Sequence, residues 1–256
     1  MEEVAYTWFN RFIALRYMEV NEYLPNRVRV FTDSEGKFNP QIIKEALSLD
    51  LDGLNRELVT NYIENQKTEE LYKYLLITEC NALNSGLPQM FEKIQNYTEL
   101  LFPNNLLNND SILASMVNDI PEEDWTDAVQ IIGWLYQFYV ADKRQQYRDA
   151  KVVTKELIPF VTQLFTPDWI VRYMVENSLG RLWYEGHKDD SLKSTWKYYL
   201  DEAEQEPDVQ IELEKIREQY KTIKPEDIKV IDPCMGSGHI LVYAFDVLMQ
   251  IYVSQG

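Results

Sequence analysis

The chain has 256 residues, of which 45% are hydrophobic and 26% are charged, so it can form one large core or two smaller ones. This composition argues against a disordered chain, a collagen-like repeat and a coiled coil. The 25 Lys and Arg against 42 Asp and Glu give a formal net charge of −17 at pH 7, which opposes sequence-independent binding to phosphate backbones. We therefore expect any nucleic acid to be bound mainly elsewhere.

The few cysteines and histidines bear on compartment and metal binding. Cys80, Cys234, His187 and His239 are scattered along the chain without the paired spacing of a zinc finger, so we expect no metal site. The sequence shows neither a charged-then-apolar leader nor an apolar run of the roughly 18 residues that a membrane span requires. We expect a reduced, cytoplasmic protein that makes no contact with membranes.

The first part of the chain predicts a helix and then a short β segment. Scarce glycine and plentiful aromatic residues favour a mostly helical protein. Trp8, Phe12 and Leu15 have the i, i+4, i+7 spacing of one helical face, which should lie in a core. Alternation over residues 27–31, followed by turn residues at 33–36, predicts a short strand or hairpin.

From residue 40 to about residue 141 the pattern is helical almost throughout and predicts a helical bundle. Turn residues interrupt it at 84–88 and 102–105, and helix starts are expected at 110–111 and 120–123. The helix after the last start carries a row of apolar and aromatic residues that could stack bases, although core packing is favoured on so acidic a chain. The row consists of Trp125, Val129, Ile132, Tyr136 and Tyr139.

The domain organisation expected from these patterns is a helical domain at 1–150 and a second domain at 151–256. Residues 186–225 shift to Lys, Asp, Glu and Gln, which indicates an acidic, solvated excursion from the second domain. Within it, Val209, Leu213, Ile216 and Tyr220 keep a helical spacing and predict a surface helix.

The strongest chemical signal lies at residues 228–241. A β-branched run at 228–231 ends in Asp232, a Gly-x-Gly turn follows at Gly236 and Gly238, and an amphipathic helix comes next. Glycines there allow positive φ and close approach to a ligand, while a helix start offers free N–H groups. Because a lone strand lacks backbone partners, we expect the last roughly 30 residues to be poorly anchored or paired with another chain.

The residues around this turn limit which class of ligand the loop could bind. No Lys follows Gly238, so the loop does not fit the phosphate loop of nucleotide triphosphatases. Leu241 stands where the dinucleotide fingerprint needs a third small residue. Asp232 ahead of the glycines suits a cationic cofactor that carries an amino-acid group. A lone Gly-x-Gly is a weak signal, and a plain strand-to-helix turn without a ligand remains an alternative.

A second segment, residues 163–171, contains Thr166 and Pro167. Thr166 is expected to cap a helix that has Pro167 at its first position, with N–H donors directed at a ligand. A capped helix without a ligand is the alternative interpretation.

Residues 232–241 resemble the S-adenosylmethionine-binding motif of adenine-specific DNA methyltransferases, Asp-Pro-Ala-Cys-Gly-Ser-Gly, with Cys234 and Met235 in place of the usual Ala-Cys. Residues 163–171 resemble the Phe/Tyr-Thr-Pro segment of the same enzymes, which closes over the cofactor. With residues 5–11, 133–139 and 165–183, the chain is similar to the PglX family of BREX phage-defence methyltransferases. The resemblance implies a set of cofactor-binding residues: Phe165, Thr166, Pro167, Asp232, Pro233, Gly236, Ser237, Gly238 and His239.

The same resemblance implies a mostly α fold: a helical N-terminal domain followed by the first elements of an incomplete, Rossmann-like α/β methyltransferase domain. The parent enzyme would methylate adenine N6 in double-stranded DNA at a specific site. It would extrude the base and hold it with an Asn/Asp-Pro-Pro-Tyr/Phe motif. The 256 residues do not contain that motif, so we assign no catalytic residue and expect the chain alone to be inactive, with DNA bound mainly by the missing C-terminal part.

Two alternatives from other classes remain. One is a helical interaction module that docks other defence-system proteins. The other is the methyltransferase part of a restriction-modification enzyme, whose nuclease would bring an Asp…Glu-x-Lys cluster. The nearest candidates are Asp33, Glu35 and Lys37, which lie so close together that a turn is favoured.

Overall fold

The computed structural model is mostly helical and divides into two compact units, Met1–Ile132 and Gly133–Gly256. It describes residues 2–92, 102–126, 130–141, 144–145, 152–155, 158, 162, 164–236 and 238–255. The predicted domain boundary at residues 150 and 151 falls among residues outside these ranges and stays a prediction.

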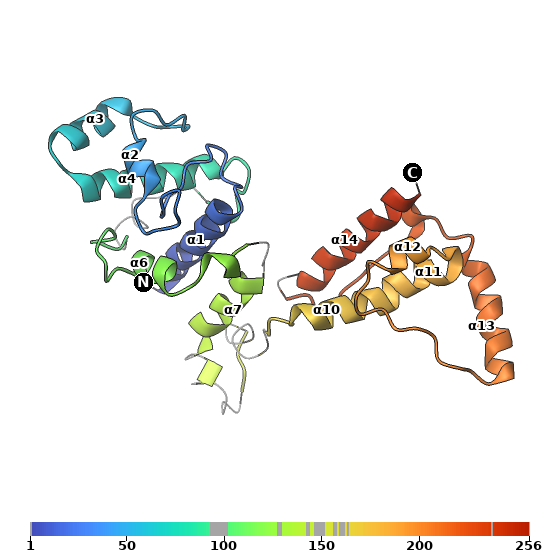
Figure 1. Cartoon of the computed structure of the whole chain (residues 1–256). Helices are drawn as coiled ribbons and strands as arrows, with labels where there is room; N and C mark the ends of the chain where they lie inside the picture. Colours follow the sequence, from blue (N-terminus) through green and yellow to red (C-terminus); the bar gives the residue numbers. More distant parts are fainter. Residues whose placement is uncertain are drawn as a thin grey trace. The chain divides into compact units, whose positions relative to one another are not determined.

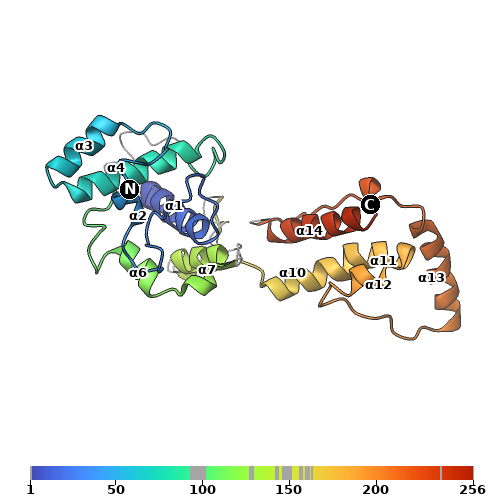
Figure 2. The ribbon, with the colours of Figure 1, turned by 45° about the horizontal axis from the view of Figure 1, so that its top comes forward.

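The helices are shown in Figures 1 and 2, in the colour order of the sequence. Those that begin in the first unit are α1 (Glu2–Val20), α2 (Gln41–Lys44), α3 (Arg56–Glu64), α4 (Thr68–Leu83), α6 (Ile112–Asn118), the 3₁₀ helix η1 (Glu122–Asp124) and α7 (Gln130–Tyr139). Those of the second unit are α10 (Asp168–Val175), the π-helix η2 (Glu176–Gly180), α11 (Arg181–His187), α12 (Asp190–Lys193), α13 (Pro207–Tyr220), the 3₁₀ helix η3 (Pro225–Asp227) and α14 (His239–Ser254).

The core of the first unit forms between α1 and α4. Trp8, Phe12 and Leu15 are all buried, which confirms the core face predicted from their spacing. The face of α4 that contributes Leu75 and Leu76 is fully buried in the same cluster. The helix start predicted near residue 111 is also confirmed, because Ser111 caps α6 by accepting a hydrogen bond from the N–H of Ala114.

Of the short strand or hairpin predicted at residues 27–36, no strand forms at residues 27–31, whereas the turn is present and is closed by one β bridge. Among the described residues, the β pairing is a single antiparallel bridge between Thr32 and Phe38. The strand does not form because its backbone groups find other partners: the Phe31 N–H donates to the Glu19 carboxylate, and the Arg29 carbonyl accepts from Ile42 in α2. Groups of neighbouring helices therefore satisfy the bonds that a second strand would have made.

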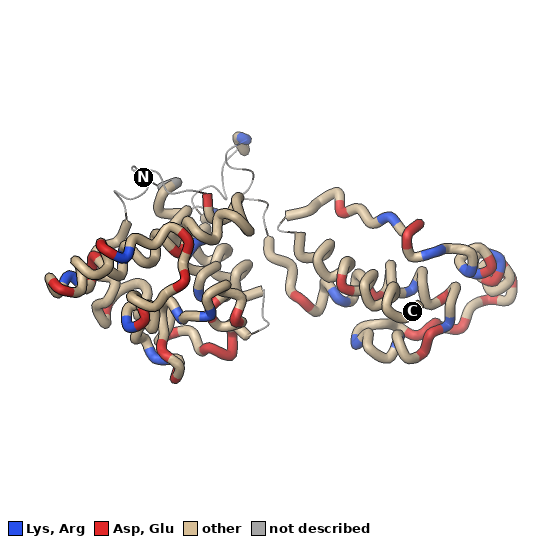
Figure 3. The backbone as a smooth tube through the Cα atoms, turned by 90° about the horizontal axis from the view of Figure 1, so that it is seen from above, with Lys and Arg blue, Asp and Glu red and all other residues tan. Residues whose placement is uncertain are grey.

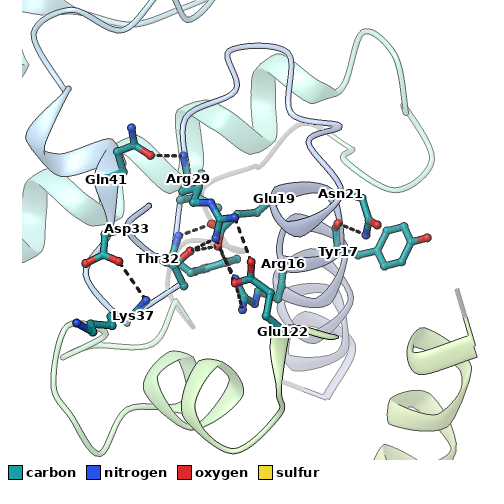
Figure 4. A network of polar contacts seen from close by, with 12 residues as sticks. Arg16, Tyr17, Glu19, Asn21, Arg29, Thr32, Asp33, Lys37, Gln41 and Glu122 are labelled. Atoms are coloured by element: carbon teal, nitrogen blue, oxygen red, sulfur yellow. Dashed lines mark hydrogen bonds and ion pairs between the residues drawn. The ribbon is translucent and has the colours of Figure 1, made fainter. Parts of the chain in front are cut away.

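A buried carboxylate joins α1 to this turn (Figure 4). Glu19 accepts hydrogen bonds from Arg16 Nη1 at 2.7 Å, from the Phe31 N–H at 2.6 Å and from Thr32 Oγ1 at 2.7 Å. The side chain of Glu19 is fully buried and that of Arg16 is 1% exposed. Burial of such a pair is tolerated because the carboxylate is paired with a cation and accepts two further hydrogen bonds.

A second carboxylate, Glu122 of η1, completes the network (Figure 4). It lies 3.2 Å from Arg16 Nη2 and accepts two hydrogen bonds of 3.1 Å from the Arg29 guanidinium. Burial would raise the pKa of Glu122, but the hydrogen bonds and charges of Arg29 and Arg16 outweigh it and lower that pKa. The network thereby ties three separate segments of the first unit together.

The predicted aromatic row is not one helix. Trp125 follows η1 in a turn and is fully buried, which agrees with core packing, whereas α7 is described over Gln130–Tyr139. Val129 lies outside the described residues. Tyr139 is 37% exposed, so the row is split between a buried loop residue and a partly exposed helix. The run is interrupted because residues 122–124 close a 3₁₀ turn after Pro121 and leave Trp125 in a turn.

In the second unit, α10 and α14 lie side by side (Figures 1 and 2). Val171 and Val175 of α10 pack with Val247 and Ile251 of α14 in one buried cluster. The expectation that the last residues are poorly anchored is therefore wrong for α14, since this helix supplies part of the core. The helix is anchored because one of its faces packs on α10.

The acidic stretch 186–225 contains the predicted surface helix, α13, none of whose residues is buried. The predicted strand at residues 228–231 has an exposed end, with Ile231 85% exposed, and no β pairing there is found among the described residues. A strand requires a neighbour, and the described part of this unit offers none. Figure 3 shows Asp and Glu spread over both units, with Lys and Arg among them. Within the described residues, no helix combines the length and apolarity that crossing a bilayer requires.

Candidate functional site

A cleft of about 570 Å³ opens in the second unit where the segment before α10 meets the loop before α14. This volume falls within the usual range for small-molecule sites, roughly 300–1,000 Å³. Its wall mixes carboxylate, hydroxyl and imidazole groups with apolar side chains. The lining residues are Thr162, Leu164, Thr166, Asp232, Pro233, Cys234, Met235, Gly236, Gly238, His239 and Ile240.

The glycine loop forms one wall of the cleft. Gly238 has φ +82°, in the left-handed region, and is the residue from which α14 starts. The first helical bond runs from the Val242 N–H to the Gly238 carbonyl, so the N–H groups of the first turn have no acceptor within the helix. Of the two glycines, Gly238 alone adopts the positive φ that glycine allows. Ser237 lies outside the described residues.

Asp232 stands at the start of this loop. One of its carboxylate oxygens accepts a hydrogen bond of 2.9 Å from the Cys234 N–H, which folds the loop back on itself. The bond holds the carboxylate at the edge of the cleft. Pro233 and Met235 complete this wall.

The segment at residues 164–168 forms the opposite wall. The predicted role of Thr166 as a helix cap is wrong: α10 begins at Asp168, and Pro167 precedes it with ψ 141° and accepts from the N–H groups of Ile170 and Val171. Pro167 takes the cap position because its φ of −54° is compatible with the entry to a helix while its ψ stays extended. Thr166 lines the cleft instead.

His239, the first residue of α14, makes the contacts from this helix to the opposite wall. Its Nδ1 lies 3.2 Å from the Thr166 carbonyl oxygen, and its Nε2 lies 3.7 Å from Asp168 Oδ1. Its ring stacks on the Phe165 ring, with centroids 4.9 Å apart and planes inclined by 14°. The imidazole side chain is 14% exposed.

Asp168 is itself held in place by a series of contacts along α10 and α14. It accepts a hydrogen bond of 2.6 Å from Arg172 Nε, and the Arg172 guanidinium lies 4.7 Å from the centroid of the Tyr243 ring. The Tyr243 hydroxyl donates to the fully buried Glu176 at 2.8 Å. Burial, followed by this hydrogen bond, raises the pKa of Tyr243, so the hydroxyl keeps its proton and remains a donor.

The structure thus brings most of the predicted cofactor residues together. Six of them line the cleft: Thr166, Asp232, Pro233, Gly236, Gly238 and His239. Phe165 reaches the site through the ring of His239, and Pro167 positions the start of α10. Their roles toward a cofactor remain predictions.

Sequence reasoning missed Asp168 and Arg172 as supporting residues. Their i, i+4 spacing on a helix was a readable sign that they interact. It also did not single out Leu164 and Ile240 as apolar lining, although both lie inside the two motif segments. In the described part of the chain, no three His, Cys, Asp or Glu side chains are grouped so that they could hold a metal ion.

Comparison with known proteins gives two related sequences. The chain is 44% identical over its whole length to the adenine-specific methyltransferase BrxX of Escherichia coli O9:H4 (strain HS). It is 41% identical, again over its whole length, to the adenine-specific methyltransferase PglX of Lacticaseibacillus casei (strain Zhang). No family model matches the chain.

The chain spans 21% and 22% of the length of these curated relatives. It is therefore homologous over its whole length to about a fifth of the BrxX and PglX adenine-specific methyltransferases, as the sequence resemblance had indicated.

Proposed function

We propose that this chain is the N-terminal part of a cytoplasmic, site-specific DNA adenine-N6 methyltransferase of a BREX phage-defence system. Its cleft would form one side of the S-adenosylmethionine site. The observation that carries this proposal is that two segments far apart in the sequence line one cleft at the start of α14: Leu164 and Thr166 on one side, and residues 232–236 and 238–240 on the other. The names of the two relatives support the reaction class.

The chemistry of the cleft fits this cofactor. S-adenosylmethionine carries a positive sulfonium, a carboxylate and an apolar methionine chain, and it supplies the methyl group that is transferred. The carboxylate of Asp232 offers negative charge for the cationic part. The first turn of α14 offers N–H donors and the positive end of a helix dipole for an anionic group. Leu164, Met235 and Ile240 offer apolar surface.

The second unit supports an incomplete α/β domain in this proposal. The face of α14 that turns away from α10 is apolar and exposed, and a helix that is apolar on all sides is normally buried. Its exposed residues are Val242, Phe245, Met249, Tyr252 and Val253. In an α/β domain, such a face would pack on a sheet, and the extended residues 228–231 would be one strand of that sheet.

DNA would be bound mainly by parts of the protein outside this chain, because the net charge of −17 opposes counterion release from a phosphate backbone. The base-holding Asn/Asp-Pro-Pro-Tyr/Phe motif does not occur in the sequence. We therefore propose that the chain by itself binds the cofactor weakly and transfers no methyl group.

The restriction-modification alternative loses its nuclease candidates. Asp33 Oδ1 accepts hydrogen bonds from the N–H groups of Glu35 and Lys37, and Lys37 Nζ bonds to Glu35 at 2.6 Å. These three residues form a turn closed by its own side chains. For the interaction-module alternative, the discriminating result is docking of a defence-system protein by a chain that does not bind the cofactor.

The test is calorimetry with S-adenosylmethionine on the chain and on its Gly238→Asp variant. We expect the variant to lose binding, because a Cβ and a negative charge would enter the place where the backbone meets the ligand. Gly53→Asp is the matched control: Gly53 has φ +80° and no heavy atom within 4 Å of the place a Cβ would take, so the backbone strain is similar but the cleft is untouched. Equal affinities for S-adenosylmethionine in all three proteins would show that the glycine loop is only a structural turn and does not bind the cofactor.

A further inference from the structure

His239 connects two segments that lie far apart in the sequence. The hydrogen bond of 3.2 Å to the Thr166 carbonyl requires a proton on Nδ1, since a carbonyl oxygen only accepts. Nε2 then faces Asp168 Oδ1 at 3.7 Å. One side chain on the first turn of α14 thus contacts the main chain before α10 and the first residue of α10.

The flat face of the imidazole makes a third contact. This face stacks on the Phe165 ring. The same Phe165 ring also lies against Gly133 of α7. A Cβ at Gly133 would overlap the Phe165 ring, so this glycine is what allows the ring to occupy its position. Phe165 is therefore held between Gly133 and His239.

The position of Asp168 is fixed independently of His239. Arg172 Nε bonds to it at 2.6 Å, and Arg172 packs over Tyr243, which donates to the buried Glu176. The wall that His239 contacts is accordingly anchored at its far end to the core of the second unit. The other end of this wall, Phe165 and Thr166, borders the cleft and is not held by these contacts.

From these contacts we propose that His239 is a positioning residue that latches residues 165–168 onto the first turn of α14, and that this latch sets how fast a ligand leaves the cleft. The inference rests on the proposed function only in naming the ligand, S-adenosylmethionine. When the latch opens, residues 165–168 would move away from the first turn of α14, and the cleft would widen. The wall that contains Asp232 and Gly238 would keep all of its groups.

Three substitutions at this position separate the contacts. His239→Phe keeps a ring to stack on Phe165 and removes the Nδ1 donor. His239→Asn keeps a donor near the place of Nδ1 and removes the ring. His239→Ala removes both. We expect His239→Ala to raise the dissociation rate of S-adenosylmethionine by about tenfold, in line with one hydrogen bond and one ring stack, and the other two variants to restore part of the difference.

His187 provides a matched control. It is also a stacked histidine, 3.7 Å from the centroid of Trp183, and its Nδ1 lies 3.2 Å from the Trp183 carbonyl oxygen, but it does not line the cleft. His187→Ala should leave ligand dissociation unchanged. Gly133→Ala is a second, independent perturbation, because it should displace Phe165 from its other side while alanine favours the helix.

Two measurements decide the proposal: hydrogen exchange of residues 164–168 without ligand, and dissociation of S-adenosylmethionine by surface plasmon resonance. Faster exchange and faster dissociation in His239→Ala and Gly133→Ala, but not in His187→Ala, support the latch. Unchanged exchange in His239→Ala overturns it, as does unchanged dissociation. If the unaltered chain binds no S-adenosylmethionine, the proposed function fails, and the exchange measurement still decides whether His239 latches the segment.

Discussion

Replacement of Glu19 by alanine should destabilise the first unit more than any other single substitution in its polar network. The carboxylate of Glu19 is the acceptor for three donors, Arg16 Nη1, the Phe31 N–H and Thr32 Oγ1, at 2.6 to 2.7 Å. In Glu19→Ala these donors stay buried and lose their acceptor. Arg16 keeps one partner, Glu122, at 3.2 Å.

The size of the effect follows from burial. Removing one partner of a buried ion pair costs about 3–5 kcal/mol, because the remaining charge stays desolvated. The unpaired Phe31 N–H and Thr32 hydroxyl would each add roughly 1–3 kcal/mol if no water reached them. Since Glu122 still compensates Arg16 in part and water can reach some of the freed donors, we expect a total of about 4 kcal/mol, a large share of the roughly 5–15 kcal/mol by which domains are stable.

Urea unfolding measures this loss, and hydrogen exchange of peptides from α1 assigns it to the first unit. Glu35→Ala is the control: Glu35 also pairs with a cation, Lys37 at 2.6 Å, but both side chains are at least 70% exposed, so we expect no measurable change. A loss below about 1 kcal/mol in Glu19→Ala would refute the reasoning that this carboxylate holds α1 to the turn.

Two further substitutions test other buried groups. Burial raises the pKa of Glu79 from 4.5 to about 7, so the folded chain binds the proton more tightly than the unfolded chain, and stability falls as pH rises from about 4.5 through 7. Glu79→Gln should remove that loss of stability. In urea unfolding, we expect the variant to be up to about 3 kcal/mol more stable than the unaltered chain at pH 8 and to differ little from it at pH 4.5. Equal stability of the two proteins at both pH values would contradict a raised pKa of Glu79. Tyr243→Phe removes the donor to the buried Glu176 and should cost about 1–3 kcal/mol, and an unchanged unfolding midpoint would show that Glu176 does not depend on it.

The sequence by itself determined several local features of the helices. The core face of Trp8, Phe12 and Leu15, the cap at Ser111 and the turn at Gly238 before α14 were all predicted and are confirmed. These features are local, because a helix bonds residues four apart and a cap or glycine acts within a few residues of its own position. The residues on both sides of the cleft were named because two short motifs resemble those of adenine-specific DNA methyltransferases.

Only the tertiary structure decided which partner each group found. The strand expected at residues 27–31 lost its backbone N–H to Glu19, and the strand expected at 228–231 shows no β partner in the described part of the chain. The contacts of His239 with Thr166 and Asp168 could not be predicted either, since no local pattern joins residues so far apart. β pairing and side-chain contacts between distant segments depend on packing of the whole unit, and periodicity along the sequence carries no record of that packing.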